Sequence, residues 1–199
     1  MGLSLSQYPG LDEHGGQVPS TCGPDWPIPH AKYTEKLLVG YRWYTAHPET
    51  KPAFAFGHGL SYTTFEYGPI AVVAASALAS SSSSSSSGGG GGGSSSGSGS
   101  SNHTVSLSLT NTGAVAGAEV AQLYLKFPEA AGEPPLQLKG FKKVFLQPKA
   151  RYELSFVLDA AALSIFDAAQ REWVVQRGEF VASVGGGLDA LVQHVSFTN

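Results

Sequence analysis

Residues 80–101 contain only serine and glycine, first a serine run, then a glycine run, then a mixture of the two. Such a segment has no side chain to bury, so it cannot offset the entropy lost when its backbone is ordered. Its composition is typical of a flexible tether. We therefore predict that residues 71–101, which are Ala-rich before they become Ser/Gly-rich, form a linker between two unlike parts of the chain, residues 1–70 and residues 102–199.

The part before this linker is rich in turn-forming residues and poor in regular structure. It holds eight of the twelve prolines of the chain. The aromatic and β-branched content of residues 36–44 predicts a strand or a strand end, and residues 54–67 predict a Gly-rich loop that leads into a short strand. For residues 71–79, a strand end and a frayed helical turn both stay open. Seventy residues of this kind bury too little surface to fold alone, so residues 1–70 are interpreted as a piece of a larger body.

The part after the linker alternates between apolar and polar side chains with the period of two that is typical of half-buried strands. The alternating segments recur about every 8–12 residues and are separated by turn sequences, as in a β-sandwich. The length of residues 102–199 suits an immunoglobulin-like domain, and the absence of cysteine from them favours the disulfide-free, fibronectin III-like kind. The side chains predicted to form the core are Val105, Leu107, Leu109, Val120, Leu123, Leu125, Phe141, Leu154, Phe156, Trp173, Phe180 and Val184.

Charge and composition exclude several function classes. The net charge is −3, from 12 basic and 15 acidic residues, which argues against a nucleic-acid-binding protein. A single cysteine, Cys22, forms no intrachain disulfide, and the six histidines show no HxH or HExxH spacing, so neither a metal site nor a cofactor is expected. No apolar run is long enough to span a bilayer, and the first residues lack the basic and apolar regions of a signal peptide.

Several strings occur in the order found in one enzyme family. Those of the first part are SQYPG (6–10), YTEKLLVGYRWY (33–44) and FAFGHGLSYTTF (54–65). Those of the second part are TNTG (110–113), AGAEVAQLYL (116–125), LKGFKKV (138–144) and the stretch 173–185. Together they resemble glycoside hydrolase family 3, whose β-glucosidases carry a VGYRWY…FPFGHGLSYTTF string near the end of their second, α/β-sandwich domain. Ala55 departs from the proline that is usual in this string.

This resemblance implies a mostly β chain with two unequal parts. Residues 1–70 correspond to an incomplete, loop-rich remnant of the α/β-sandwich domain, and residues 102–199 correspond to the fibronectin type III-like domain that closes such enzymes. The implied function is that of a C-terminal fragment of a β-glucosidase- or β-xylosidase-like hydrolase of O-glycosyl bonds, active in carbohydrate metabolism. The family implies an extracellular, cell-wall or vacuolar location.

The catalytic groups of the family fall outside the matched strings. Its Asp nucleophile lies in an N-terminal barrel, within a Ser/Thr-Asp-aromatic motif, and its acid/base usually lies earlier in the α/β-sandwich domain. Asp25-Trp26 echoes the nucleophile motif, but it lies between prolines and a loop is favoured. Glu35 is kept as a catalytic candidate because the acid/base position varies, although a solvated carboxylate paired with Lys32 or Arg42 is favoured. We therefore predict that this chain alone is inactive and supports the catalytic domains.

The other site candidates are weighed in the same way. His58, between two glycines, is predicted to be a buried, hydrogen-bonding residue that fixes its loop, with a sugar contact as the alternative. Arg42 is expected to stack or to pair with a carboxylate of the absent body rather than to bind substrate. Asn102-His103-Thr104 is an N-glycosylation sequon, which is an acceptor only on the secretory path. Aromatic residues that form either a carbohydrate platform or, as favoured, structural contacts are Trp26, Trp43, Tyr124, Tyr152 and Trp173.

Two function classes stay open. In the first, the chain is the C-terminal piece of a family 3 hydrolase, and its partners are the catalytic domains. In the second, it is a free-standing fibronectin III-like module that binds a polysaccharide or a partner protein. Neither class involves a nucleic acid or a membrane.

Overall fold

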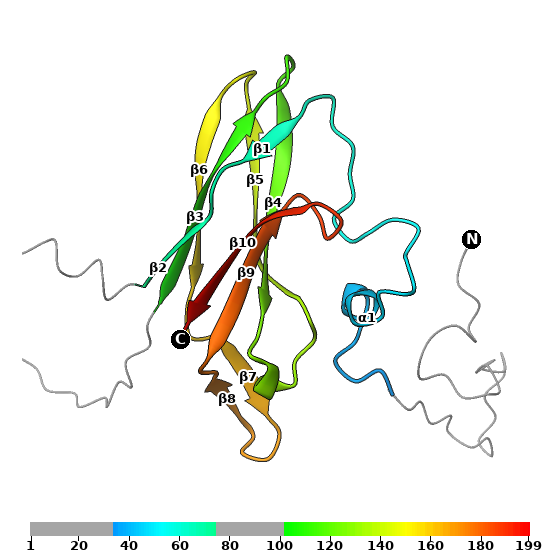
Figure 1. Ribbon diagram of the computed structural model, residues 1–199, viewed down its shortest axis with the longest axis vertical. Helices are drawn as coiled ribbons and strands as arrows, with labels where there is room; N and C mark the ends of the chain where they lie inside the picture. The colour runs from blue at the N-terminus through cyan, green and yellow to red at the C-terminus, as the bar shows by residue number, and fades with distance from the viewer. Residues whose placement is uncertain (1–33, 75–101) are drawn as a thin grey trace, which may run out of the picture.

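Two antiparallel sheets pack face to face in a computed structural model, which describes residues 34–74 and 102–199 (Figure 1). Sheet A contains β1 (Phe65–Tyr67), β2 (Ala71–Ala74), β3 (His103–Asn111) and β6 (Arg151–Leu158). Sheet B has the order β10 (Leu191–Thr198), β9 (Glu179–Gly185), β4 (Gly117–Lys126), β5 (Gln137–Leu146). Two short strands, β7 (Ser164–Asp167) and β8 (Glu172–Val175), form a separate ribbon. The helical elements are α1 (Tyr41–Ala46) and the 3-10 turn η3 (Glu129–Ala131).

The predicted alternation places the core correctly in most strands. In β3, Val105 and Leu107 lie opposite Phe156 and Leu154 of β6, and all four side chains are buried between the sheets. Nine of the twelve predicted core residues are buried: Val105, Leu107, Leu109, Leu123, Leu125, Leu154, Phe156, Phe180 and Val184. The mostly β fold class and the fibronectin III-like sandwich are therefore confirmed.

Three predicted core residues are exposed, namely Val120 at 37%, Phe141 at 66% and Trp173 at 70%. Val120 and Phe141 lie on the outer face of sheet B, because β4 pairs with β5 in a register that leaves the odd-numbered residues of β4 facing the core. Trp173 was assigned to a sandwich strand, but it lies on β8 of the ribbon, directly opposite Phe166. These three assignments were wrong.

The segment before β1 also differs in part from the prediction. Residues 36–44 were expected to form a strand, but α1 begins at Tyr41, after Gly40 with a φ of 61°. Residues 54–67 form the expected loop that leads into a short strand, β1. Of residues 71–79, the first four form β2, which resolves the open alternative in favour of a strand over that range. Within the described ranges no helix has the length and apolar character needed to cross a membrane.

The strands on either side of the Ser/Gly run belong to one sheet. Both β1 and β2 precede the run and pair with β3, so that Phe65 lies opposite Asn111 and Ala74 lies opposite His103. The run therefore joins two neighbouring strands of sheet A rather than two domains, and the sandwich begins at β1, before the boundary expected at residue 102. The predicted disorder of residues 80–101 lies outside the described residues.

Candidate functional site

Tyr41, the first residue of α1, fixes the segment before the sandwich onto sheet B. Its ring packs edge-on against Tyr124 of β4, with centroids 6.0 Å apart, and its hydroxyl accepts a hydrogen bond of 2.9 Å from the backbone N–H of Leu138 in β5. Tyr124 is fully buried although it points away from the core between the sheets. Because both faces of β4 are covered here, Ala121–Leu125 form a continuous buried run.

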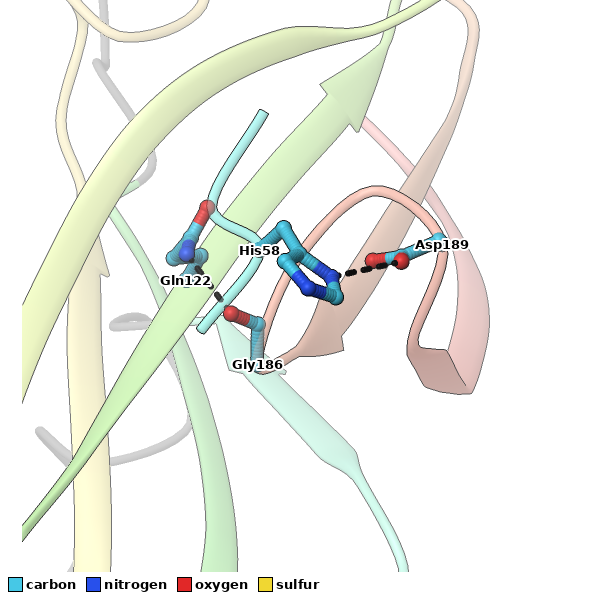
Figure 2. Close-up of polar contacts among 4 residues, drawn as sticks. All are labelled: His58, Gln122, Gly186 and Asp189. Atoms are coloured by element: carbon cyan, nitrogen blue, oxygen red, sulfur yellow. Dashed lines mark hydrogen bonds and ion pairs between the residues drawn. The ribbon is translucent and has the colours of Figure 1, made fainter. Parts of the chain in front are cut away.

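A second contact joins the loop after α1 to the same strand. Gly57 has a φ of +86°, and a Cβ added at Gly57 would overlap the side-chain amide of Gln122. That amide is held in place, because Gln122 Nε2 donates a hydrogen bond of 2.8 Å to the carbonyl of Gly186 (Figure 2). In addition, Gln122 Oε1 accepts a hydrogen bond of 2.5 Å from the Tyr124 hydroxyl. The positive φ and the close approach of the Gln122 side chain to the Gly57 backbone therefore require glycine at position 57.

The loop also contacts the turn between β9 and β10. His58 Nδ1 lies 3.4 Å from a carboxylate oxygen of Asp189 (Figure 2), and the backbone N–H of Leu188 donates a hydrogen bond of 3.0 Å to the carbonyl of Phe56. The His58 side chain is 38% exposed, so its predicted burial was wrong. His58 was also predicted to fix the loop. Its side chain makes only a long, exposed contact with Asp189 and a ring contact with Phe54 among the described residues.

These contacts enclose an open groove of about 400 Å³ between α1, the loop and the β9–β10 turn. The lining residues are Gly40, Tyr41, Tyr44, Thr45, Pro52, Phe54, Ala55, Phe56, Leu188 and Asp189. Large apolar side chains are also exposed along this segment, namely Leu37, Val39, Phe54, Phe56, Leu60 and Tyr62. We refer to these six side chains and the groove together as the apolar segment face. A surface of this kind is suited to contact with another protein body.

The groove is not arranged for glycoside hydrolysis. A retaining glycosidase needs two carboxyl groups about 5–5.5 Å apart, whereas Asp189 supplies the only carboxylate among the groove-lining residues that the structure describes. Glu35 lies outside this lining, in the turn before α1, where its backbone carbonyl accepts a hydrogen bond from Leu38. One Glu35 carboxylate oxygen is buried without a hydrogen-bond partner among the described residues. The favoured ion pair of Glu35 with Arg42 is not among the ion pairs of the described residues, and the catalytic alternative stays untested.

Arg42 stacks rather than pairs with a carboxylate. Its guanidinium lies 5.9 Å from the ring centroid of Tyr41, and no described carboxylate forms an ion pair with it. Burial lowers the pKa of Lys139 on β5; Glu133 opposes this effect and the positive charge of Arg42 adds to it. Two cationic side chains are thus close together where α1 meets sheet B.

The remaining candidates are spread over the molecule. Asn102 is exposed immediately before β3, and its modification stays untested. The aromatic residues do not form one platform: Tyr124 is buried, the Trp43 ring stacks on His47 with centroids 4.3 Å apart, and Tyr152 and Trp173 lie on different sheets. Asp25 and Trp26 lie outside the described residues. Across residues 34–74 and 102–199, no group of three or more potential metal ligands is found.

Sequence reasoning did not identify Gln122, Gly186 and Asp189 as partners of the segment before the sandwich. One local signal was available for Gln122, because it lies in the run Ala121–Leu125, where apolar residues occur at successive positions. Such a run is typical of a strand that is covered on both faces. Gly186 and Asp189 lie in a turn and carry no comparable signal.

Comparisons with known proteins agree with this architecture. A family model described as a fibronectin type III-like domain matches residues 119–187, from β4 to the turn after β9. The chain is 39% identical over 171 residues to the probable beta-glucosidase G of Aspergillus terreus and 36% identical over 167 residues to beta-glucosidase BoGH3A of Bacteroides ovatus. These matches cover 85% and 83% of this chain, but the chain spans only about a fifth of the length of either relative.

Solved structures give the same assignment. The beta-D-glucoside glucohydrolase of Trichoderma reesei superposes with a TM-score of 0.67 at 31% identity, over 87% of this chain and 24% of that one. Beta-glucosidase 3B of Thermotoga neapolitana, solved in complex with glucose, superposes with a TM-score of 0.69 at 29% identity, over 98% of this chain and 22% of that one. The chain is therefore similar to the C-terminal, fibronectin type III-containing region of the β-glucosidases of glycoside hydrolase family 3.

Proposed function

We propose that this chain is the non-catalytic C-terminal part of a β-glucosidase-like enzyme and that it supports the catalytic domains. The reaction of the whole enzyme would be hydrolysis of β-glucosidic bonds, with two carboxyl groups supplied by those domains. The sandwich would then act as a rigid base that holds the segment before it in one position.

The apolar segment face is the observation that carries this proposal. Its exposed side chains, such as Leu60 and Tyr62, lie on a segment that is itself fixed to the sandwich through Tyr41 and Gly57. Ordering an exposed apolar segment gives no stability unless a further surface covers it. In the relatives named above the matched region is a fifth of a longer chain, and a multidomain protein of this kind provides such a surface.

A reconstitution experiment tests the proposal. The chain is mixed with the separately expressed upstream region of a related family 3 β-glucosidase, and hydrolysis of an aryl β-glucoside is measured beside an aryl β-xyloside at pH 5–7. We expect the chain alone to be inactive and the mixture to gain stability or activity that neither part has alone. An active chain whose turnover disappears in Glu35→Gln would contradict the proposal, and so would a mixture without any gain.

A second candidate function rests on the ribbon. Phe166 and Trp173 face each other across β7 and β8, with ring centroids 5.7 Å apart, and both are exposed. An exposed tryptophan face can stack on a pyranose ring, which favours binding of a polysaccharide. A binding assay with insoluble β-glucan tests this: loss of retention in Trp173→Ala, with Phe141→Ala as the exposed-aromatic control, would support it, whereas no retention of the wild-type chain would exclude it.

A further inference from the structure

The two outer faces of the sandwich differ in chemistry. The outer face of sheet A is formed mainly by hydroxyl and charged side chains from β3 and β6, with Ser106 opposite Ser155 and Thr110 opposite Arg151. Arg151 and Glu153 form an ion pair of 2.8 Å on this face. Such a surface is typical of a sheet that faces water.

The outer face of sheet B carries an apolar strip instead. Val120, Phe141 and Phe145 are exposed there, and Lys143 lies between the two phenylalanines. The register proves that the strip is one surface, because Val120 lies opposite Lys143, Phe141 lies opposite Gln122, and directly opposite residues share a face. We call these four residues the β4–β5 strip.

The β4–β5 strip continues the contact made by the segment before the sandwich. Phe141 lies directly opposite Gln122, the residue that Gly57 covers, so the strip begins where that cover ends. In Figure 1, α1 and the loop that follows it run along the side of β4, while β2, β3 and β6 lie on the other side of the sandwich. The apolar segment face and the β4–β5 strip are therefore on the same side of the molecule.

From this asymmetry we propose that the β4–β5 strip is a second contact through which the sandwich docks onto the catalytic body of the enzyme. This inference rests on the proposed function and adds which sheet faces that body: sheet B is covered, and the outer face of sheet A remains in water. The partner surface is apolar with acidic groups, because Lys143 lies within the strip and Arg42, on the α1 helix that is fixed to the same sheet, has no described carboxylate partner.

A second copy of this chain fits the strip less well. A twofold contact would bring the same patch of each copy together, so Lys143 of one copy would lie near Lys143 of the other. The β4–β5 strip is also continuous with the apolar segment face. This continuity favours one partner, the catalytic body of the same enzyme, that covers both surfaces.

Substitutions of two side chains with similar exposure, on opposite faces of the sandwich, test the proposal. Phe145 is 63% exposed on sheet B, and Val157 is 65% exposed on the outer face of sheet A. In the two-part mixture we expect Phe145→Asp to weaken association by about tenfold or more, and Val157→Asp to leave it unchanged. Thermal unfolding of each isolated variant checks that the sandwich is intact. Hydroxyl-radical footprinting of the wild-type mixture gives a second readout that needs no variant, with protection expected at Phe141 and Phe145.

The outcomes separate this inference from the proposed function. Failure of the wild-type chain to associate would overturn both. Association that is insensitive to Phe145→Asp, with no protection of Phe141 or Phe145, would overturn the inference alone. Sedimentation that shows a wild-type dimer dissociated by Phe145→Asp would also overturn it, because the strip would then bind a second copy.

Discussion

The Tyr67 hydroxyl donates a hydrogen bond of 2.8 Å to a carboxylate oxygen of Glu119. Tyr67 belongs to β1 of sheet A and Glu119 to β4 of sheet B, so this bond joins the two sheets. Burial, the hydrogen bond and the negative charge of Glu119 all raise the pKa of Tyr67. The last residue of β1 is thereby attached to the sheet that carries the β4–β5 strip.

Removal of this hydroxyl tests its contribution. We expect Tyr67→Phe to lower the free energy of unfolding by about 1–3 kcal/mol, because Glu119 then loses its partner in a partly buried position. Tyr62→Phe is the matched control, since Tyr62 is 99% exposed, and it should have no measurable effect. Urea denaturation of the three proteins measures the difference, and equal stability of both variants would show that water replaces the bond.

Tyr124 gives a prediction for the pH dependence of stability. Burial, followed by the nearby Tyr41 hydroxyl, raises the pKa of Tyr124 to about 12, whereas tyrosine in an unfolded chain titrates near pH 10. Tyr124 therefore loses its hydroxyl proton at a lower pH in the unfolded state than in the folded state. Its contribution to the free energy of unfolding is complete below about pH 10 and is lost as the pH rises toward 12.

The measurement is the free energy of unfolding at pH 8 and pH 11. We expect the wild-type chain to lose stability between these values, and Tyr124→Phe to lose less over the same interval. The comparison uses the pH difference within each protein, because Tyr124→Phe also removes the hydrogen bond to Gln122. An identical pH difference in both proteins would contradict the assignment to Tyr124.

Two neighbouring glycines test the fixed position of the loop. Gly57→Ala should destabilise the loop, because the φ of +86° disfavours an L-residue by about 1–2 kcal/mol and the new methyl group would overlap Gln122. Gly59→Ala should be tolerated, since no atom lies within 4 Å of its added Cβ. Limited proteolysis should cut near the loop faster in Gly57→Ala only; equal cutting rates would mean that the loop is not held by Gln122.

The sandwich core gives a prediction about stability alone. Leu154 is buried between the sheets, and Leu154→Ala should cost about 2–5 kcal/mol. Val157→Ala, three residues along the same strand and exposed on the outer face, should cost less than about 0.5 kcal/mol. Chemical denaturation distinguishes the two, and similar costs would contradict the inward orientation of Leu154.

The inward face of β3 and β6 in sheet A was predictable because only one face of each strand is mainly apolar. In β3 and β6 the outward positions are mostly polar, so the apolar positions identify the core face. In β5 both faces carry apolar side chains: Val144 points inward, while Phe141 and Phe145 point outward. When both faces of a strand carry apolar side chains, alternation with a period of two residues does not distinguish the core face from a docking face. Phe141 was assigned to the core for this reason.

The candidate site was less predictable than the fold. Its contacts join residues far apart in the chain, such as Gly57 with Gln122 and His58 with Asp189, and no local pattern indicates such pairs. The helix α1 was missed because its aromatic sequence, YRWYTA, has only moderate helix propensity. Contacts such as that of the Tyr41 hydroxyl with Leu138 override this local preference.

The connection of β2 to β3 through the Ser/Gly run has a consequence for variation among copies of this sequence. Ala74 and His103 lie opposite each other across β2 and β3, and the free energy of closing a chain between two fixed ends rises only with the logarithm of its length, by about 0.6 kcal/mol for each doubling. Serine and glycine residues can therefore be added to or removed from the run with little effect on the sandwich, and we expect chains with runs of different length to keep the register of β2 with β3.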